Sequence, residues 1–149
     1  MSPFELRLAQ LLLSVGGLWA AITMTGAYYG WWRGPARLVP ERLCSPKVGG
    51  CMDILSTPYA RAFGPPNSLL GIFYYLMLLG LALAGPEAPG AALRAGFMVL
   101  SWGVVVFSIY LAWSLIFRLR TACVLCFFSH VVNLGLALAL TAAPGGAGS

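Results

Sequence analysis

Charged residues are scarce in this chain. Only 9% of its 149 residues are Asp, Glu, Lys or Arg, whereas 60% are hydrophobic. A typical soluble domain has roughly 25% charged residues, so this deficit excludes an ordinary soluble domain and indicates a membrane protein surrounded by lipid. The formal net charge is +5, but the chain lacks a basic run interleaved with aromatic side chains. We therefore expect no nucleic-acid partner.

A basic segment is also lacking at the N-terminus. Met1 to Glu5 contains no Lys or Arg, and the apolar run that follows is longer than the roughly 7–15 residues of a signal-peptide core. We therefore expect the first apolar segment to be retained as a membrane helix. We also expect a single domain over residues 1–143 and a flexible tail over residues 144–149, which are proline and small residues.

Long apolar segments occur four times, at about residues 8–29, 68–84, 93–117 and 123–143. A bilayer core requires about 20 mostly apolar residues per helix, and a spanning backbone must satisfy its own hydrogen bonds. The sequence therefore predicts an all-α integral membrane four-helix bundle. The small residues that would let its helices approach closely are Gly16, Gly17, Ala20, Gly71, Gly103 and Gly135.

The one long connection, at about residues 30–67, joins the first two predicted helices. It contains six of the ten prolines and most of the charged residues. A connection of this length in a compact protein is usually functional. We expect it to form a cap over the bundle, with a short helix near residues 52–63.

Only four cysteines are present, and they form two pairs. Cys44 and Cys51 lie in the long connection, and Cys123 and Cys126 begin the fourth predicted helix. The first and third connections of a four-span bundle face the same side, so both pairs lie on one side of the membrane. The partial positive charge of a helix N-terminus favours a thiolate at the C-x-x-C pair. We expect the two pairs to relay electrons by thiol–disulfide exchange.

Other interpretations of the cysteines remain open. They could be static disulfides of a structural four-span protein, ligands of a zinc ion, or ligands for heavy-metal transport. A static disulfide gives no reason, however, for further polar residues along the fourth helix. Polar residues at spacings of 3, 4 and 3 do share one face of that helix: Cys123, Cys126, His130 and Asn133.

Polar side chains within a membrane usually face the bundle interior or a cavity. This face would therefore meet a lipophilic two-electron carrier that enters from the bilayer, and a quinone has this character. His130 could bond one quinone oxygen or move a proton, and Asn67 could bond the other oxygen. Equally, His130 and Asn133 could form hydrogen bonds between helices, and Asn67 could cap the second helix.

Several short motifs accompany the cysteines. They are Cys44 with Cys51, Ser56-Thr57, Phe63-Gly64-Pro65, Asn67-Ser68-Leu69-Leu70-Gly71, Tyr74-Tyr75, Tyr110-Leu111-Ala112-Trp113 and Cys123-Val124-Leu125-Cys126. In this set of motifs the chain resembles the vitamin K epoxide reductase family, from its first span to Asn133. The resemblance implies a four-helix bundle around a pocket for a quinone of the ubiquinone, menaquinone or vitamin K type.

The resemblance also implies a role for each cysteine. Cys44 and Cys51 would exchange with a thioredoxin-like, DsbA-like protein. Cys51 would then pass electrons to Cys123, and Cys126 would reduce the quinone. In bacterial members of the family the result is disulfide formation in secreted proteins. Animal members instead reduce vitamin K epoxide and vitamin K quinone, which is the alternative function for this chain.

Three features depart from the family pattern. His130 stands where animal members carry a tyrosine, which leaves the quinone contact open. Ser56 and Thr57 compete for the position of a serine that supports catalysis, and Thr57 fits better by its distance from Cys51. Many bacterial members carry a fused thioredoxin-like domain that is lacking here, so we expect the thiol partner to be a separate protein.

Charge and redox chemistry disagree about the sidedness of the chain. The cysteine side would hold seven Lys and Arg residues, and the opposite side would hold only Arg7 and Arg94. The positive-inside rule therefore places the cysteines in the cytoplasm, whereas disulfides persist mainly in oxidising compartments. We expect a multi-pass protein of the cell (inner) membrane with its cysteines on the extracytoplasmic face, and the inverted orientation is the alternative.

Overall fold

Four long helices dominate the structure, a computed structural model that describes residues 1–31, 54–85, 90–120 and 123–143. In chain order they are α1 (Pro3–Tyr29), α3 (Asn67–Ala84), α4 (Ala91–Trp113) and α5 (Val124–Ala142). A short 3₁₀ helix, η2 (Pro58–Arg61), precedes α3, and a π-helical turn, η3 (Ser114–Leu119), continues α4. No strand occurs among the described residues, so the predicted all-α four-helix bundle is confirmed.

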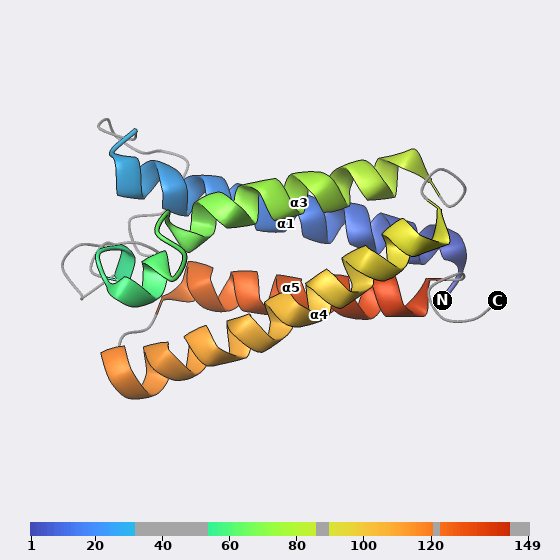
Figure 1. Ribbon diagram of the computed structural model, residues 1–149. Helices are drawn as coiled ribbons and strands as arrows, with labels where there is room; N and C mark the ends of the chain where they lie inside the picture. Colours follow the sequence, from blue (N-terminus) through green and yellow to red (C-terminus); the bar gives the residue numbers. More distant parts are fainter. Residues whose placement is uncertain (32–53, 86–89, 121–122, 144–149) are drawn as a thin grey trace.

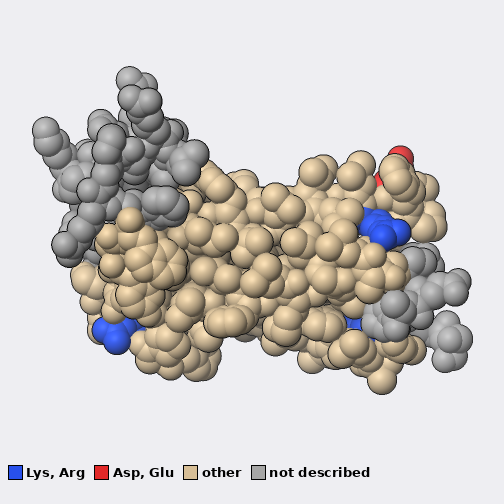
Figure 2. Space-filling view, turned by 90° about the horizontal axis from the view of Figure 1, so that it is seen from above, with Lys and Arg blue, Asp and Glu red and all other residues tan. Residues whose placement is uncertain are grey.

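The surface of the bundle is apolar along its length. All four helices are long and apolar enough to cross a membrane, and the third of these spans runs through α4 and η3 from Ala91 to Leu119. On the face shown in Figure 2, the charged side chains lie near the two ends of the bundle, and the long middle part carries none. The chain is therefore a multi-pass membrane protein, as its composition predicted.

Helix α1 starts earlier than the apolar pattern alone predicted, because polar residues cap it. The Ser2 hydroxyl accepts a hydrogen bond from the Glu5 N–H at 3.2 Å, and the Glu5 carboxylate accepts one from the Ser2 N–H at 2.6 Å. This reciprocal capping box satisfies two backbone donors that a helix start otherwise leaves unpaired. The helix ends at Gly30, which takes the left-handed conformation (φ 68°).

The four helices pack as an incomplete ring, in which three of the four neighbouring pairs make extensive contact. Helix α1 packs against α3 and α5, and α5 also packs against α4. A core cluster fills the space between α1, α3 and α5: Ala21, Tyr74, Tyr75, Leu78, Leu81, Val132, Leu136 and Leu140. Helices α3 and α4 touch each other little, but one buried hydrogen bond at 2.9 Å joins them, from the Tyr74 hydroxyl to the Ser101 hydroxyl.

The two ends of the bundle differ in what they hold. The end of α1, η2, the start of α3, η3 and the start of α5 lie together at the left of Figure 1. The described part of the long connection and the C-x-x-C pair therefore share one end, as the span count predicted. Most of that connection, with Cys44 and Cys51, lies outside the described residues, as does the predicted tail at residues 144–149.

At the opposite end of the bundle, an arginine side chain caps the C-terminus of α3. Arg7 of α1 donates from Nε to the Ala82 carbonyl at 2.8 Å and from Nη2 to the Leu83 carbonyl at 3.0 Å. The last carbonyls of a helix have no partner within the helix and carry partial negative charge, so a guanidinium stabilises them.

Small residues allow close contact at most of the predicted positions. A Cβ at Gly17 would lie 2.3 Å from the Tyr75 ring, which is closer than any real contact. Hypothetical Cβ atoms at Gly16, Gly71 and Gly135 also meet neighbours, at 3.4, 3.6 and 3.0 Å. The prediction was wrong for Gly103, because among the described residues nothing beyond its chain neighbours and the adjacent backbone of its own helix lies within 4 Å of its Cβ position.

Core packing of α3 generates a first prediction. Leu78 is completely buried, whereas Leu76 on the same helix is 47% exposed on the surface that faces lipid. Lipid chains are as apolar as leucine, so Leu78→Ala loses packing contacts rather than transfer free energy. We expect Leu78→Ala to lower the unfolding free energy by about 2 kcal/mol, the low end of the range for buried leucines.

Thermal unfolding in detergent measures this effect, with Leu76→Ala as the matched control that removes the same atoms from the outer surface. Equal shifts of Tm in the two variants would contradict the core assignment.

Candidate functional site

The C-x-x-C pair forms a disulfide at the start of α5. Cys123 stands immediately before the helix, Cys126 lies in its first turn, and their sulfurs are bonded. The sulfur of Cys123 also accepts a hydrogen bond from the Cys126 N–H at 3.2 Å, so it serves as the N-cap of α5. Cys123 is completely buried and Cys126 is 7% exposed, and both belong to a core cluster with Ala20, Ile54 and Leu115.

A cavity of about 630 Å³ lies beside Cys126. Small-molecule sites in proteins usually measure about 300–1,000 Å³ and are mostly apolar with a few polar groups, and this cavity has both properties. Phe73 and Met77 of α3 and Leu100 of α4 line the cavity and are also exposed on the outer surface. The cavity therefore opens toward lipid on the side where α3 and α4 touch little.

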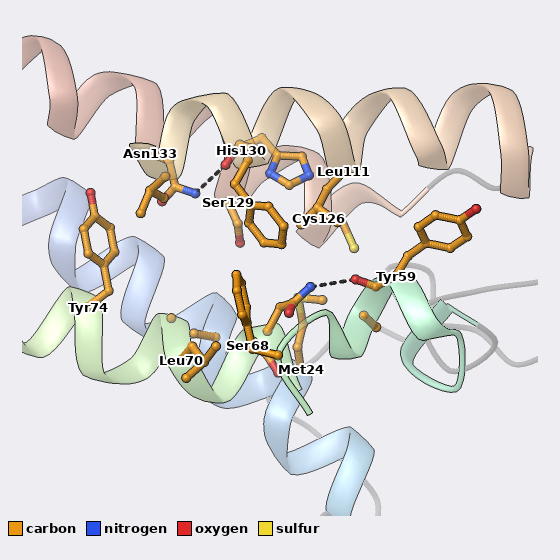
Figure 3. A pocket seen from close by; sticks show the side chains of 18 of the residues that line it. Met24, Tyr59, Ser68, Leu70, Tyr74, Leu111, Cys126, Ser129, His130 and Asn133 are labelled. Atoms are coloured by element: carbon orange, nitrogen blue, oxygen red, sulfur yellow. Dashed lines mark hydrogen bonds between the residues drawn. The ribbon is translucent and has the colours of Figure 1, made fainter. Parts of the chain in front are cut away.

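His130 lies one turn beyond Cys126 and lines the same cavity. Figure 3 shows Cys126, His130 and Asn133 along one side of the cavity, with α3 on the other side. Both ring nitrogens of His130 are buried, and neither has a hydrogen-bond partner among the described residues. A buried polar group without a partner costs about 1–3 kcal/mol, so a hydrogen-bonding ligand in the cavity would stabilise the site. The structure does not show the helix–helix hydrogen bond that the sequence left open for this residue.

Asn133 lines the cavity one further turn along α5, and both polar atoms of its amide form hydrogen bonds. The amide oxygen accepts a hydrogen bond from the Tyr75 hydroxyl at 2.7 Å, and the amide nitrogen donates to the Ser108 hydroxyl at 2.9 Å. Here the hydrogen bonds between helices that the sequence left open are present. They join α5 to both α3 and α4.

Asn67 is the first residue of α3 and also lines the cavity, but it does not cap its helix. Its amide nitrogen donates to the Tyr59 carbonyl at 2.7 Å, and its amide oxygen accepts from the Ala62 N–H at 3.3 Å. Pro66 occupies the N-cap position of α3, so Asn67 is free to hold η2. As a result, Tyr59 and Phe63 form part of the cavity wall.

The two candidate hydroxyl residues of the long connection lie next to η2. The Thr57 hydroxyl donates to the Ile54 carbonyl at 2.7 Å, which closes the turn before η2. Ser56 is exposed, and neither residue is among the described residues that line the cavity. The structure therefore brings Cys123, Cys126, His130, Asn133 and Asn67 to one site, and it places Ser56 and Thr57 beside that site. The candidates Cys44 and Cys51 lie outside the described residues.

Sequence reasoning missed the residues that support this site from neighbouring helices. Tyr75 and Ser108 hold Asn133 in place, and Tyr59 and Phe63 of the connection contact the α4 rings of Tyr110 and Phe107 at centroid distances of 6.5 and 5.6 Å. A tyrosine hydroxyl within an apolar helix signals a buried partner and could have identified Tyr75. Serines are too common in membrane helices for Ser108 to stand out.

The arrangement combines a disulfide, an imidazole with free hydrogen-bonding capacity and an apolar cavity that reaches lipid. Such a site can exchange two electrons between the sulfurs and an apolar ligand that carries polar oxygen atoms. Among the four described stretches of chain, no three His, Cys, Asp or Glu side chains come together as a metal site requires.

Comparison with known proteins finds a matching family and a similar mouse protein. The chain matches the Vitamin K epoxide reductase family over residues 8–141, a range that includes all four cysteines and every residue of the cavity. It is also similar to Vitamin K epoxide reductase complex subunit 1 of Mus musculus, at 33% identity over 103 residues. That match covers 59% of this chain and 60% of the mouse protein, so it spans less than two thirds of that relative.

The two hydrogen bonds of Asn67 generate a second prediction. Asn67→Ala removes both contacts to η2, so we expect amide hydrogen exchange over residues 58–64 to become about 5–30-fold faster, as the loss of one to two hydrogen bonds implies. Exchange measured by mass spectrometry tests this. Ser68→Ala is the control, because Ser68 bonds Thr25 of α1 at 2.9 Å instead of η2. Unchanged exchange in Asn67→Ala would contradict the anchoring role.

Proposed function

The chain belongs to the Vitamin K epoxide reductase family, and from this premise we propose that it is a quinone-linked thiol–disulfide oxidoreductase. It passes electrons from a separate thioredoxin-like, DsbA-like protein, through its two cysteine pairs, to a membrane quinone, and so supports disulfide formation. One observation carries this proposal: the Cys123–Cys126 disulfide borders a cavity that opens to lipid and that is also lined by His130, whose two ring nitrogens are buried.

The electron path follows from thiol–disulfide chemistry and from the family pattern of the cysteines. The partner's dithiol reduces the Cys44–Cys51 disulfide, and the partner becomes oxidised. The thiolate of Cys51 then attacks the sulfur of Cys123, which breaks the Cys123–Cys126 bond and releases the Cys126 thiolate. Attack of Cys44 on Cys51 re-forms the first disulfide and leaves the second pair as a dithiol.

Cys123 and Cys126 then return from the dithiol to the disulfide that the structure contains. Cys126 lines the cavity, so it is the sulfur that faces the substrate. The dithiol of Cys123 and Cys126 gives up two electrons and two protons as its disulfide forms, and the quinone leaves as the hydroquinone. A buried, mostly apolar site keeps water away from the sulfurs during this step.

The polar residues of the cavity fit a quinone with its two carbonyl oxygens. His130, when one ring nitrogen carries a proton, donates to one oxygen, and no competing partner for it occurs among the described residues. Asn67 has two amide N–H donors and uses one of them on the Tyr59 carbonyl, so the other can reach the second oxygen. Asn133 also lines the cavity, and Tyr75 and Ser108 hold its amide.

On the thiol side, we assign a supporting role to Thr57, with Ser56 as the alternative. Thr57 closes the turn at Ile54, and Ile54 belongs to the same core cluster as Cys123 and Cys126. Ser56 and Thr57 also come directly before η2, whose residues Tyr59 and Ala60 line the cavity.

A vitamin K-type substrate is the second candidate, and the name of the mouse relative favours it. In that case the same sulfurs reduce vitamin K epoxide to the quinone or the quinone to the hydroquinone. Epoxide consumption by the purified chain with a dithiol reductant separates this function from quinone reduction alone.

A third prediction concerns the sulfur that faces the cavity. The purified chain, supplied with a reduced thioredoxin-like protein and a short-chain quinone, should reduce the quinone, as followed by absorbance. Cys126→Ala should lower the rate to that of the uncatalysed reaction. Val131→Ala, which changes a lipid-facing residue of α5 that is 69% exposed, should keep the full rate.

An unchanged rate in Cys126→Ala would overturn the relay, and no activity in the wild type would favour the static four-span alternative. Cys51→Ala should block electrons from the protein partner, while a small dithiol should still reduce the Cys123–Cys126 disulfide directly.

A fourth prediction concerns sidedness. We propose that the cysteine end faces away from the cytoplasm, because disulfide exchange with a secreted-protein oxidant requires an oxidising compartment. Four spans that start in the cytoplasm also end there, so alkaline phosphatase fused after Ala143 should be inactive in a bacterial host. The same reporter fused after Arg120, between η3 and α5, should be active. The reverse pattern would establish the inverted orientation that the positive-inside rule favours.

A further inference from the structure

One cluster of the bundle carries no electrons in the path described above. It consists of Gly17, Tyr75, Ser108 and Asn133, which come from α1, α3, α4 and α5, and it is called the Asn133 cluster below. We infer that Tyr75 is a positioning residue that fixes Asn133 in the wall of the cavity and thereby determines which quinone ring the site accepts. This inference rests on the proposed function and deepens it.

All four helices contribute to the Asn133 cluster. The Tyr75 side chain is 3% exposed, and its ring fills the space left by the missing side chain of Gly17. Its hydroxyl donates to the Asn133 amide oxygen at 2.7 Å, and the Asn133 amide nitrogen donates to the Ser108 hydroxyl at 2.9 Å. The position of Asn133 is therefore set by hydrogen bonds to two other helices, α3 and α4, and the α3 partner packs in turn against α1.

Fixing Asn133 also fixes the two reacting groups of α5. Asn133 follows His130 by three residues and Cys126 by seven, so all three lie on one face of the helix, as Figure 3 shows. Rotation of α5 about its axis would turn the imidazole and the sulfur away from the cavity together with the amide. The hydrogen bonds of Asn133 oppose such a rotation at a point one turn beyond His130.

A comparison within the structure separates this role from general stabilisation. Tyr74, the neighbour of Tyr75, makes a similar buried hydrogen bond to Ser101 of α4 at 2.9 Å. Ser101 is completely buried and is not among the residues that line the cavity, whereas Asn133 and Ser108 both line it. Tyr74 itself lines the cavity, but its bond to Ser101 touches no residue of α5. Loss of the Ser101 bond should therefore mainly weaken helix packing, whereas loss of the Tyr75 bond should also release Asn133 on the α5 face that carries Cys126 and His130.

The orientation of the Asn133 amide can determine the size of quinone ring that the cavity accepts. An asparagine amide offers two N–H donors and two lone pairs, and the Asn133 cluster uses one N–H and one lone pair. Without the Tyr75 hydroxyl, the amide can turn further into the cavity and narrow it. A two-ring naphthoquinone would then lose space that a one-ring benzoquinone does not need.

The test compares Tyr75→Phe with Ser101→Ala in the purified full chain. The substrates are menadione, which has two rings, and a one-ring dimethoxybenzoquinone. Each variant loses one buried hydrogen bond between helices, so their Tm values should fall by similar amounts. For Tyr75→Phe we expect the KM for menadione to rise about 5–10-fold, as the loss of one hydrogen bond implies, with little change in kcat. The preference between the two quinones should shift accordingly.

Ser101→Ala should leave both KM values and the preference close to those of the wild type. The inference is overturned if Tyr75→Phe keeps the wild-type preference, or if Ser101→Ala shifts it equally. Gly17→Ala should repeat the effect of Tyr75→Phe, because a Cβ there displaces the ring, and Gly16→Ala, with its nearest neighbour at 3.4 Å, is the matched control. If Gly17→Ala does not fold, Tyr75→Phe alone decides, since it keeps the ring and removes one oxygen atom.

Failure of the proposed function gives a different result from failure of this inference. A wild type that reduces no quinone with any thiol would contradict the proposed function. The inference would then be decided by the binding of menadione, measured as quenching of tryptophan fluorescence. A Kd that is weaker in Tyr75→Phe but not in Ser101→Ala would support it, and equal Kd values in the two variants would overturn it.

Discussion

The interior of a membrane bundle offers no water to polar side chains, so each of them must find its partner within the protein or in a ligand. This constraint organises the structure. Arg7 closes the end of α3, Asn67 holds η2, and Asn133 joins three helices. Among the described residues, the buried side-chain atoms without a partner are the Ser14 hydroxyl, Arg94 Nε and the two ring nitrogens of His130, and of these three residues His130 alone lines the cavity.

The incomplete ring of helices explains why the cavity can exist. A bundle that closed on all sides would fill its interior with side chains, as protein cores usually do. Here α1 and α5 pack closely against each other and each against one further helix. Helices α3 and α4 are instead joined by the buried Tyr74–Ser101 hydrogen bond, and their apolar side chains elsewhere line the cavity. Gly103 of α4 belongs to this open side, and it therefore has no close neighbour.

The sequence predicted the features that depend on length, count and spacing. Four apolar runs give four helices, the order of the connections places the C-x-x-C pair at the end that holds η2, and the 3-4-3 spacing puts Cys126, His130 and Asn133 along one cavity wall. The start of α1 at Pro3 was missed because the apolar pattern ignored the Ser2 and Glu5 cap. The π-helical turn after Trp113 has no signal in hydropathy at all.

Features that depend on partners distant in the chain could not be predicted. Asn67 bonds the backbone of η2, and a backbone carbonyl leaves no mark in the amino-acid sequence. Tyr75 fits against Gly17 only because α1 and α3 pack in one register, which hydropathy does not specify. Hydropathy also does not show which neighbour a small residue faces. Gly103 was therefore assigned to a helix contact, although a small residue can equally leave room for a cavity.

The sulfur that caps α5 connects redox state with helix structure. In the described disulfide state, Cys123 accepts the N–H of Cys126, a donor that the first turn of any helix must otherwise leave to water or to another side chain. That donor is well placed for a sulfur that carries negative charge, which binds N–H groups more strongly than a neutral sulfur does. In the proposed relay, this N–H therefore anchors the first turn of α5 in both redox states, and the sulfurs can react without unwinding of the helix.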